Sequence, residues 1–345
     1  MTLTEAQQTL RDTLRRPLRD LRISVIDKCN FRCPYCMPEE RYHANYQFLR
    51  NGELLTFEEI GRLARIFAAL GARKLRITGG EPLLRRGLPD LVRDLAAIGE
   101  VDDLALTTNG VYLGGCAHAL REAGLSRLTV SLDSVDDGLF RRMNGNKRGI
   151  APVLEGVAAA RTAGFQEIKF NCVVQRGVNC HALLELVEHF RWTGHILRFI
   201  EYMDVGTCND WRRDHVVPSR EVLGRIHARY PVTPLEENYH GEVAARYAFD
   251  DGAGEIGFIS SVTAPFCGAC TRARLGADGV LYTCLFAARG TDLRTPLRQG
   301  ASDADIAGVI AAVWENRGDR YSELRARRPA EPAARRRIEM YQIGG

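Results

Sequence analysis

The sequence predicts an α/β protein in which a parallel sheet, open or closed into a barrel, precedes a smaller α+β part. Six strand-like runs alternate with helix-like runs before residue 203, and repeated β/α units imply a parallel sheet. Short motifs with chemical character follow these strands, which is where parallel α/β folds place their sites. After residue 210 the alternation ends, because prolines at 218, 231 and 234 break the pattern.

The individual elements are predicted from hydrophobic periodicity and turn residues. Strands are expected at residues 21–26, 74–78, 103–108, 127–133, 167–174 and 196–202. Helices are expected near residues 57–70, 88–98, 152–162 and 182–192, and a further helix is expected to end at residue 123. A long loop is expected before residue 152. In the C-terminal part we expect a strand at 255–260 and, at 272–284, a hairpin turning at Asp278-Gly279. The expected division is an extension at 1–15, the β/α units at 16–210 and a C-terminal domain at 211–345.

Composition and charge indicate an ordinary cytoplasmic globular protein. The net charge of +4, from 47 basic and 43 acidic residues, is too small to argue for nucleic acid. No apolar run approaches the ~18 residues of a membrane span, and the N-terminus lacks the apolar core of a signal peptide. Ten cysteines in such a protein are ligands or buried thiols rather than disulfides. The four scattered ones are expected as buried free thiols: Cys116, Cys172, Cys180 and Cys208.

Two cysteine triplets carry the strongest chemical signal. Cys29, Cys33 and Cys36 lie in CNFRCPYC, directly after the first predicted strand. Three thiolates in one loop favour a [4Fe–4S] cluster whose fourth iron is open to a small molecule. The alternatives are zinc with a distant fourth ligand, a thioredoxin-type pair in CPYC, and chance clustering.

The second triplet is Cys267, Cys270 and Cys284, in FCGACTRARLGADGVLYTC. It also lacks an obvious fourth cysteine, which again favours an open [4Fe–4S] cluster. Zinc is the alternative, with His240 as a fourth ligand.

The first motif resembles the radical S-adenosylmethionine superfamily, and GGEP after the second strand fits the same pattern. The whole set resembles the GTP 3′,8-cyclase family of molybdenum cofactor biosynthesis over about residues 15–345. The matching segments are RDLRISVIDKCNFRCPYCMP, KLRITGGEPLLRR, LTTNG, VSLDS, IKFNCVVQRGVN, RFIEYM, GFISSVTAPFCGACTRARLGADGVLYTCLF and the terminal Gly-Gly. Thr271, Gly276 and residues 319–326 depart from the family pattern, which leaves fine positioning open.

The resemblance implies an incomplete (β/α)6 TIM-type barrel, with a smaller C-terminal α+β domain covering the barrel opening. It implies a lyase with two [4Fe–4S] clusters and S-adenosylmethionine. A 5′-deoxyadenosyl radical would abstract hydrogen at C3′ of GTP, giving (8S)-3′,8-cyclo-7,8-dihydroguanosine 5′-triphosphate. The implied partners are GTP, a low-potential electron donor and a downstream cyclic pyranopterin monophosphate synthase, with no nucleic acid and no membrane. A homodimer stays open.

Site residues carry over where the local motif matches. The cofactor contacts implied are Tyr35, Gly80, Ser131 and Met203. The GTP contacts implied are Arg22, Arg76, Thr107, Lys169, Arg272 and Arg274, and the catalytic residues implied are Arg272, Arg274, Gly344 and Gly345. Alternation along a strand independently directs Arg76 and Thr78 to one face, and it likewise makes Arg272 and Arg274 face the same way on their own strand. Solvated strand faces are the alternative for the arginines, and an outward direction is the alternative for Lys169.

Three rival functions remain at this point. A radical enzyme that modifies a peptide would need a peptide-binding surface and would not use the arginines. A zinc-binding nucleic-acid module would need a stronger basic patch. A cluster-bearing scaffold without catalysis would not cleave the cofactor.

Overall fold

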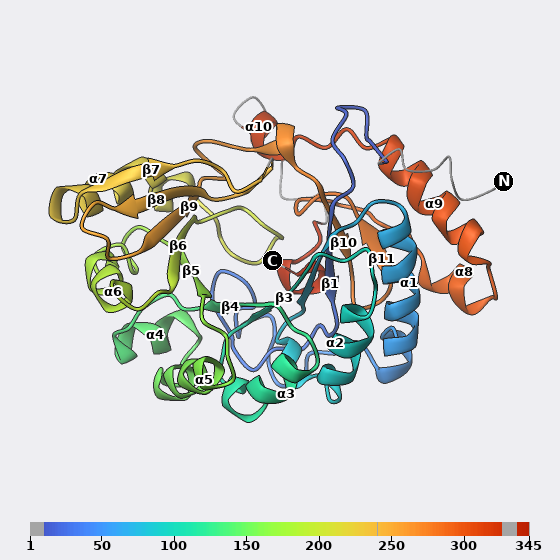
Figure 1. Ribbon diagram of the computed structural model, residues 1–345, viewed down its shortest axis with the longest axis horizontal. Helices are drawn as coiled ribbons and strands as arrows, with labels where there is room; N and C mark the ends of the chain where they lie inside the picture. The colour runs from blue at the N-terminus through green and yellow to red at the C-terminus, as the bar shows by residue number, and fades with distance from the viewer. Residues whose placement is uncertain (1–9, 240, 326–336, 345) are drawn as a thin grey trace.

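The computed structural model describes residues 10–239, 241–325 and 337–344, which share one twelve-stranded sheet (Figure 1). Strands β1 to β6 follow one another in chain order and pair in parallel. Their bounds are Asp20–Ser24 (β1), Lys74–Thr78 (β2), Asp103–Thr108 (β3), Arg127–Ser131 (β4), Ile168–Val174 (β5) and Ile196–Glu201 (β6). The six predicted strands are therefore confirmed, with small shifts at their ends.

The C-terminal part lengthens this sheet at both edges. β9 (Glu255–Ile259) lies parallel to β6, and β10 (Arg272–Leu275) lies parallel to β1. Antiparallel strands continue outward from each: β8 (Ala245–Phe249) and β7 (Val232–Leu235) on one side, β11 (Val280–Tyr282) and β12 (Thr291–Asp292) on the other. The predicted hairpin is thus β10–β11, and the barrel is incomplete, as predicted. The domain boundary that we propose at residue 210 falls between β6 and the next helix.

Helices cover the outside of the curved sheet (Figure 1). Those between the barrel strands are α1 (Phe57–Ala69), α2 (Leu88–Ala96), α3 (Ala117–Glu122), α4 (Asp137–Met143), α5 (Ala151–Thr162) and α6 (Leu183–Phe190). The later ones are α7 (Ser219–Arg229), α8 (Arg294–Arg298), α9 (Asp303–Glu315), α10 (Tyr321–Leu324) and α11 (Met340–Ile343). Thr56 and Glu59 form a capping box at α1, and Ser302 and Asp305 form one at α9.

Among the barrel strands, one helix was not predicted. The segment between residues 134 and 151, expected as a long loop, contains α4. The Asp136 side chain accepts a hydrogen bond from Leu139 N at 2.6 Å, which caps this helix. Leu139, Phe140 and Met143 then bury one face of it, so packing stabilises a helix too short for a clear periodic signal.

Strand alternation explains what lies on each side of the barrel wall. Leu21, Ile23, Leu75 and Ile77 are at most 1% exposed and face the helices. The residues between them face the barrel interior, and the strand register sets Arg22 beside both Arg76 and Arg274. The core and the interior charges are consequences of the same alternation.

The four scattered cysteines are free thiols, but only two are fully buried. Cys172 and Cys208 are buried as predicted, whereas Cys116 and Cys180 are only partly buried, which corrects the prediction. Cys116 lies just before α3, where its thiol donates to the Tyr112 carbonyl at 3.3 Å. Among the described helices, none is long and apolar enough to cross a membrane.

Candidate active site

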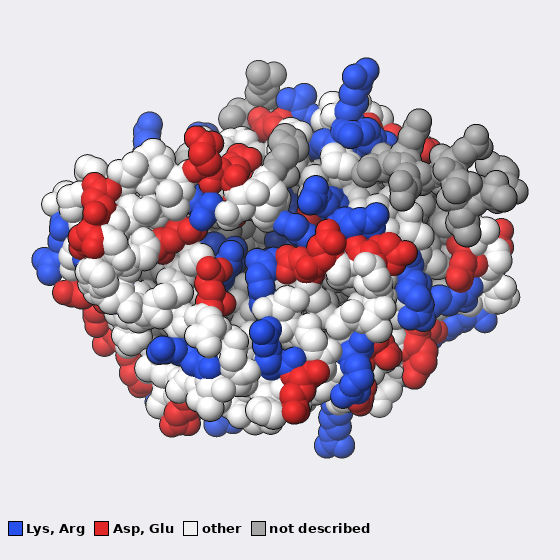
Figure 2. All heavy atoms as spheres, viewed as in Figure 1, with Lys and Arg blue, Asp and Glu red and all other residues white. Residues whose placement is uncertain are grey.

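A cavity of about 440 Å³ runs through the barrel interior and brings the two cysteine triplets to one space. The first triplet lines it from the loop that follows β1: Cys29, Cys33 and Cys36. The second triplet lines it from the segments next to β10 and β11: Cys267, Cys270 and Cys284. Basic side chains border the hollow at the centre of the face shown in Figure 2. Residues 250 positions apart in the chain therefore share one candidate active site.

The first triplet lies in the loop after β1 and is held by short-range contacts. Cys36 N and Met37 N both donate to Cys33 O, at 3.0 and 2.8 Å, which turns the loop back on itself. Arg32 fixes the same loop, because its guanidinium donates to Cys29 O at 2.8 Å and to Tyr42 O at 2.7 Å. Burial, with the nearby Glu81 carboxylate, raises the pKa of Cys29 to about 12.

Thiols with raised pKa values deprotonate readily only when a metal takes up the negative charge. Burial is also the main cause that raises the pKa of Cys33 and of Cys36. These three partly buried thiols therefore have the donor chemistry of a metal site rather than of free reactive cysteines.

The second triplet lies around β10 and differs in its electrostatics. Burial alone would raise the pKa of Cys270, but the Arg272 and Arg317 guanidiniums outweigh it and lower the pKa to about 6. Arg272 Nη2 lies 3.1 Å and Arg317 Nη2 lies 3.2 Å from Cys270 Sγ. Burial and the nearby Asp319 raise the pKa of Cys284 to about 11.

A single metal ion does not fit either triplet as it stands. Within the described ranges, no group of three or more His, Cys, Asp or Glu side chains is placed to hold one ion. The thiols of an iron–sulfur cluster bind different irons, so they need not converge on a point. His240, the predicted fourth zinc ligand, lies outside the described residues.

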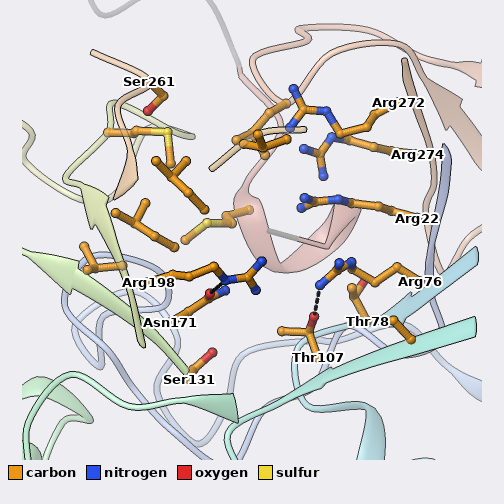
Figure 3. Close-up of a pocket in the computed structure, with 18 of the residues that line it drawn as sticks. Arg22, Arg76, Thr78, Thr107, Ser131, Asn171, Arg198, Ser261, Arg272 and Arg274 are labelled. Carbon is orange, nitrogen blue, oxygen red and sulfur yellow. Dashed lines mark hydrogen bonds between the residues drawn. The ribbon is translucent and has the colours of Figure 1, made fainter. Parts of the chain in front are cut away.

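Among the described residues seven arginines line the cavity, and the five labelled in Figure 3 face the space between the triplets. Arg22 and Arg76 come from β1 and β2, Arg272 and Arg274 from β10, and Arg198 from β6 on the opposite wall. Burial and the neighbouring arginines lower the pKa of Arg274 to about 10. Burial and the nearby Arg76 and Arg127 lower the pKa of Arg198 to about 9. Such mutual repulsion makes the cavity a strong site for a polyanion.

The substrate contacts that the sequence predicts all line this cavity. Arg76 donates to Thr107 Oγ1 at 3.2 Å and to Thr129 Oγ1 at 3.3 Å, which holds the guanidinium across the barrel. Lys169 lines the cavity with its side chain 15% exposed, so it does not point outward. Its ammonium lies 3.5 Å from Glu167 Oε1, which pairs its charge.

Sequence reasoning missed Arg198 and Asn171. Arg198 Nε donates to Asn171 Oδ1 at 3.0 Å, and Asn171 lies beside it on β5 in the strand register. The available signal was an arginine flanked by apolar residues in ILRFIE, the same pattern that identified Arg76. Lys74 and Arg127 also line the cavity and were not singled out.

The predicted cofactor contacts line the same cavity as the first triplet. Tyr35, Ser131 and Met203 line the cavity, and the Tyr35 hydroxyl donates to Asp133 Oδ2 at 2.7 Å. The structure gives its own reason for glycine at position 80, because a Cβ there would collide with the Lys28 carbonyl. Backbone atoms of the GGEP loop thereby pack directly on the loop that carries Cys29.

Glu81 shapes that loop through its hydrogen bonds. Its buried carboxylate accepts from Thr108 Oγ1 and Asn109 N, both at 2.7 Å, and from Leu83 N at 3.0 Å. Burial raises the pKa of Glu81 to about 7.

The C-terminal tail enters the barrel. Tyr341 in α11 packs on Tyr42, with ring centroids 5.1 Å apart, and its hydroxyl is 3.0 Å from that of Tyr46. Beyond this anchor, Gly344 is buried and its carbonyl accepts a hydrogen bond from Arg274. α11 accordingly lies inside the ring of strands (Figure 1). Gly345 lies outside the described residues.

The fold and the triplet after β1 define a class of proteins. Residues 23–190 match the Radical SAM superfamily, and residues 195–323 match the family described as Molybdenum Cofactor Synthesis C. Streptococcus suis SuiB bound to S-adenosylmethionine shares the fold, with a TM-score of 0.59 at 15% sequence identity, covering 85% of this chain and 68% of that one. The class brings S-adenosylmethionine and an iron–sulfur cluster as cofactors.

Curated relatives narrow the class to one family. The GTP 3′,8-cyclase of Xanthomonas axonopodis pv. citri is 56% identical over 336 residues, covering 97% of this chain and 99% of that protein. The GTP 3′,8-cyclase of Staphylococcus epidermidis is 43% identical over 340 residues, covering 98% and 100%. The chain belongs to the GTP 3′,8-cyclase family.

Proposed function

We propose that this protein converts GTP to (8S)-3′,8-cyclo-7,8-dihydroguanosine 5′-triphosphate, the first step of molybdenum cofactor biosynthesis. The observation that carries the proposal is the single cavity in which five guanidinium groups lie between two cysteine triplets. A polyanion held by these arginines would be fixed between two metal centres, an arrangement with no use in a peptide-modifying enzyme.

Each triplet would hold one [4Fe–4S] cluster through its three thiolates. Cys29, Cys33 and Cys36 would hold the cluster next to S-adenosylmethionine, within reach of Tyr35, Ser131 and Met203. When bound, S-adenosylmethionine and a reduced cluster would supply a 5′-deoxyadenosyl radical able to abstract the hydrogen at C3′ of the ribose. Cys267, Cys270 and Cys284 would hold the second cluster, near the guanine base.

The protein's own residues bind, orient and shield the substrate. Arg22, Arg76, Arg198 and Lys169 would neutralise the triphosphate and fix its direction along the barrel, because guanidinium donors match phosphate oxygens in pairs. Arg272 and Arg274 would hold the end near the second cluster. The tail at Gly344, anchored by Tyr341, would close the cavity against water while the substrate radical exists.

The remaining partners follow from this reaction. A low-potential electron donor must reduce the cluster, and a cyclic pyranopterin monophosphate synthase would take the product. The protein would act in the cytoplasm, without nucleic acid or membrane, and a homodimer is compatible with the proposal.

The test is an anaerobic assay of protein reconstituted with iron and sulfide, given dithionite, S-adenosylmethionine and GTP. We expect GTP-dependent 5′-deoxyadenosine and the cyclised nucleotide, both lost in Cys33→Ala and both retained in Cys180→Ala, a cysteine outside the cavity lining. Formation of 5′-deoxyadenosine without any dependence on GTP, and no cyclised product, would refute the proposal.

A further inference from the structure

A buried cluster of three charged residues contacts the loops of the second cysteine triplet, and one of the three, Arg317, also lines the cavity. Asp12, Arg16 and Arg317 are 6%, 2% and 4% exposed. Asp12 Oδ2 lies 2.6 Å from Arg16 Nε and 3.1 Å from Arg317 Nη1. We call these three residues the Asp12 triad.

A buried triad of this kind is costly, because desolvation of charges often exceeds their mutual attraction. A second carboxylate adjoins the triad, because Asp319 Oδ2 lies 3.6 Å from Arg317 Nε. Arg16 Nη2 is buried without a hydrogen-bond partner, so the donor capacity exceeds what the triad itself uses. A negatively charged group close to the triad would satisfy this remaining donor.

The triad contacts every segment that carries a cysteine of the second triplet. Arg16 Nη1 donates to Cys267 O at 2.7 Å, and Arg317 Nη1 donates to Cys270 O at 2.7 Å. Arg317 Nε donates to the carbonyl of Thr283, the residue before Cys284, at 3.1 Å. Trp314 supports this geometry, since the Arg317 guanidinium lies over its ring at 4.5 Å.

The segment that departs from the family pattern completes the same shell. Glu323 Oε1 accepts from Gly268 N at 2.8 Å, between the first two cysteines of the triplet. Asp319 Oδ2 accepts from Thr283 Oγ1 at 2.6 Å, and Tyr321 stacks on Phe286 at 4.4 Å. Residues 319–325 thus act around the second triplet, while Ala326 lies outside the described residues.

The two triplets differ in the charge that touches their sulfurs. Arg317 and Arg272 both donate to Cys270 Sγ. Among the described residues, no Lys or Arg donates to a sulfur of the first triplet, whose Cys29 Sγ instead accepts from Phe31 N at 3.4 Å. Arg32 lies near that loop, but its donors go to carbonyl oxygens and to the Met37 thioether sulfur. Charged neighbours of the first triplet include three carboxylates: Glu81, Asp133 and Glu339.

We infer that Arg317, held by Asp12 and Arg16, is a positioning residue that raises the reduction potential of the second cluster above that of the first. A cluster gains negative charge when it is reduced, so a guanidinium donating to a ligand sulfur favours the reduced state. Carboxylates around the first triplet act in the opposite direction. The inference rests on the second cluster of the proposed function.

The experiment isolates the second cluster in the full-length chain. Cys29, Cys33 and Cys36 are replaced by alanine, so that any [4Fe–4S] signal comes from the second triplet. Arg317→Gln, Arg317→Lys and the exposed control Arg65→Gln are compared in this background. Iron and sulfide content is measured first, and the midpoint potential is then followed by EPR in a redox titration.

We expect Arg317→Gln to lower the midpoint potential so that the ratio of reduced to oxidised cluster at a fixed potential falls at least tenfold, which is ~59 mV for one electron. Arg317→Lys, which keeps the charge, and Arg65→Gln should stay near the parent value. An Arg317→Gln protein that loses its cluster while Arg317→Lys keeps the parent potential also supports the role of charge.

Two results would overturn the inference. An unchanged potential in Arg317→Gln removes the electrostatic role, and loss of the cluster in both Arg317 variants shows a purely structural one. If the triple-alanine parent itself takes up no [4Fe–4S] cluster, the two-cluster proposal fails together with the inference, and the iron content distinguishes this case.

Discussion

Removing Arg198 should stabilise the protein without substrate and weaken its binding of GTP. Arg198 faces the cavity opposite four other guanidiniums, and burial with its arginine neighbours lowers its pKa from 12.5 to about 9. A basic group with a depressed pKa in the folded state disfavours folding at every pH at which it is charged, which here includes neutral pH. Arg198→Gln removes this unfavourable term and keeps a side chain able to donate to Asn171.

The structure sets the magnitude of both effects. At 1.36 kcal/mol per pKa unit, the shift gives an upper bound of about 5 kcal/mol. Water and ions entering the cavity screen the repulsion, and the hydrogen bond to Asn171 is weakened, so we expect a net gain of about 1–2 kcal/mol. A charge-assisted bond to phosphate contributes about 1.5–3 kcal/mol, so GTP should bind roughly 10- to 100-fold more weakly.

The assay pairs thermal unfolding with calorimetric titration of GTP, in chloride buffer without phosphate or sulfate. Arg198→Gln should raise Tm without ligand, and inorganic triphosphate should stabilise the native protein more than the variant. Arg65→Gln on the exposed side of α1 is the matched control. A variant with a lower Tm in the absence of anions, or with unchanged GTP affinity, would refute the reasoning.

Three further outcomes are expected. Arg272→Ala should leave cleavage of S-adenosylmethionine but abolish cyclisation, measured as 5′-deoxyadenosine without cyclic product; an active variant contradicts the role given to Arg272. Gly344→Ala should lower cyclisation at least tenfold with an unchanged Tm, because the φ of Gly344 is +66° and a Cβ there would collide with Thr78. The control Gly99→Ala, at a position with open space around it, should match the parent. Equal turnover in both variants would show that the tail is not part of the site. Burial lowers the pKa of His195, so the free energy of unfolding should fall as the pH drops below about 6.5. Urea titrations of His195→Gln should show a smaller loss of stability in acid. An unchanged pH profile of stability would exclude His195 as its cause.

Much of the fold and of the cavity lining could be predicted from the sequence, because the sequence patterns that indicate them are local. The first cysteine triplet, GGEP and Arg76 each follow or occupy a strand whose alternation is visible in a few residues. β10 and β11 were predicted for the same reason, from Asp278-Gly279 between two apolar runs.

The parts that were missed depend on distant contacts. Arg16 and Arg317 carry no motif, and only the fold places them 2.7 Å from the carbonyls of Cys267 and Cys270. The joining of β9 to β6 and of β10 to β1 likewise requires knowledge of the whole sheet. α4 was missed because tertiary packing, rather than periodicity, stabilises a short helix.

The position of β9 and β10 at the two edges of the barrel sheet has a consequence for synthesis of the protein. Until residues 255–275 leave the ribosome, β1 and β6 are both edge strands with unpaired backbone groups, which readily pair with other chains. The edges of the sheet formed by the nascent β/α units are therefore covered only after β9 and β10 have been synthesised. Contacts of such large sequence separation form slowly. A chain interrupted after β6 should be an aggregation hazard rather than a smaller working barrel.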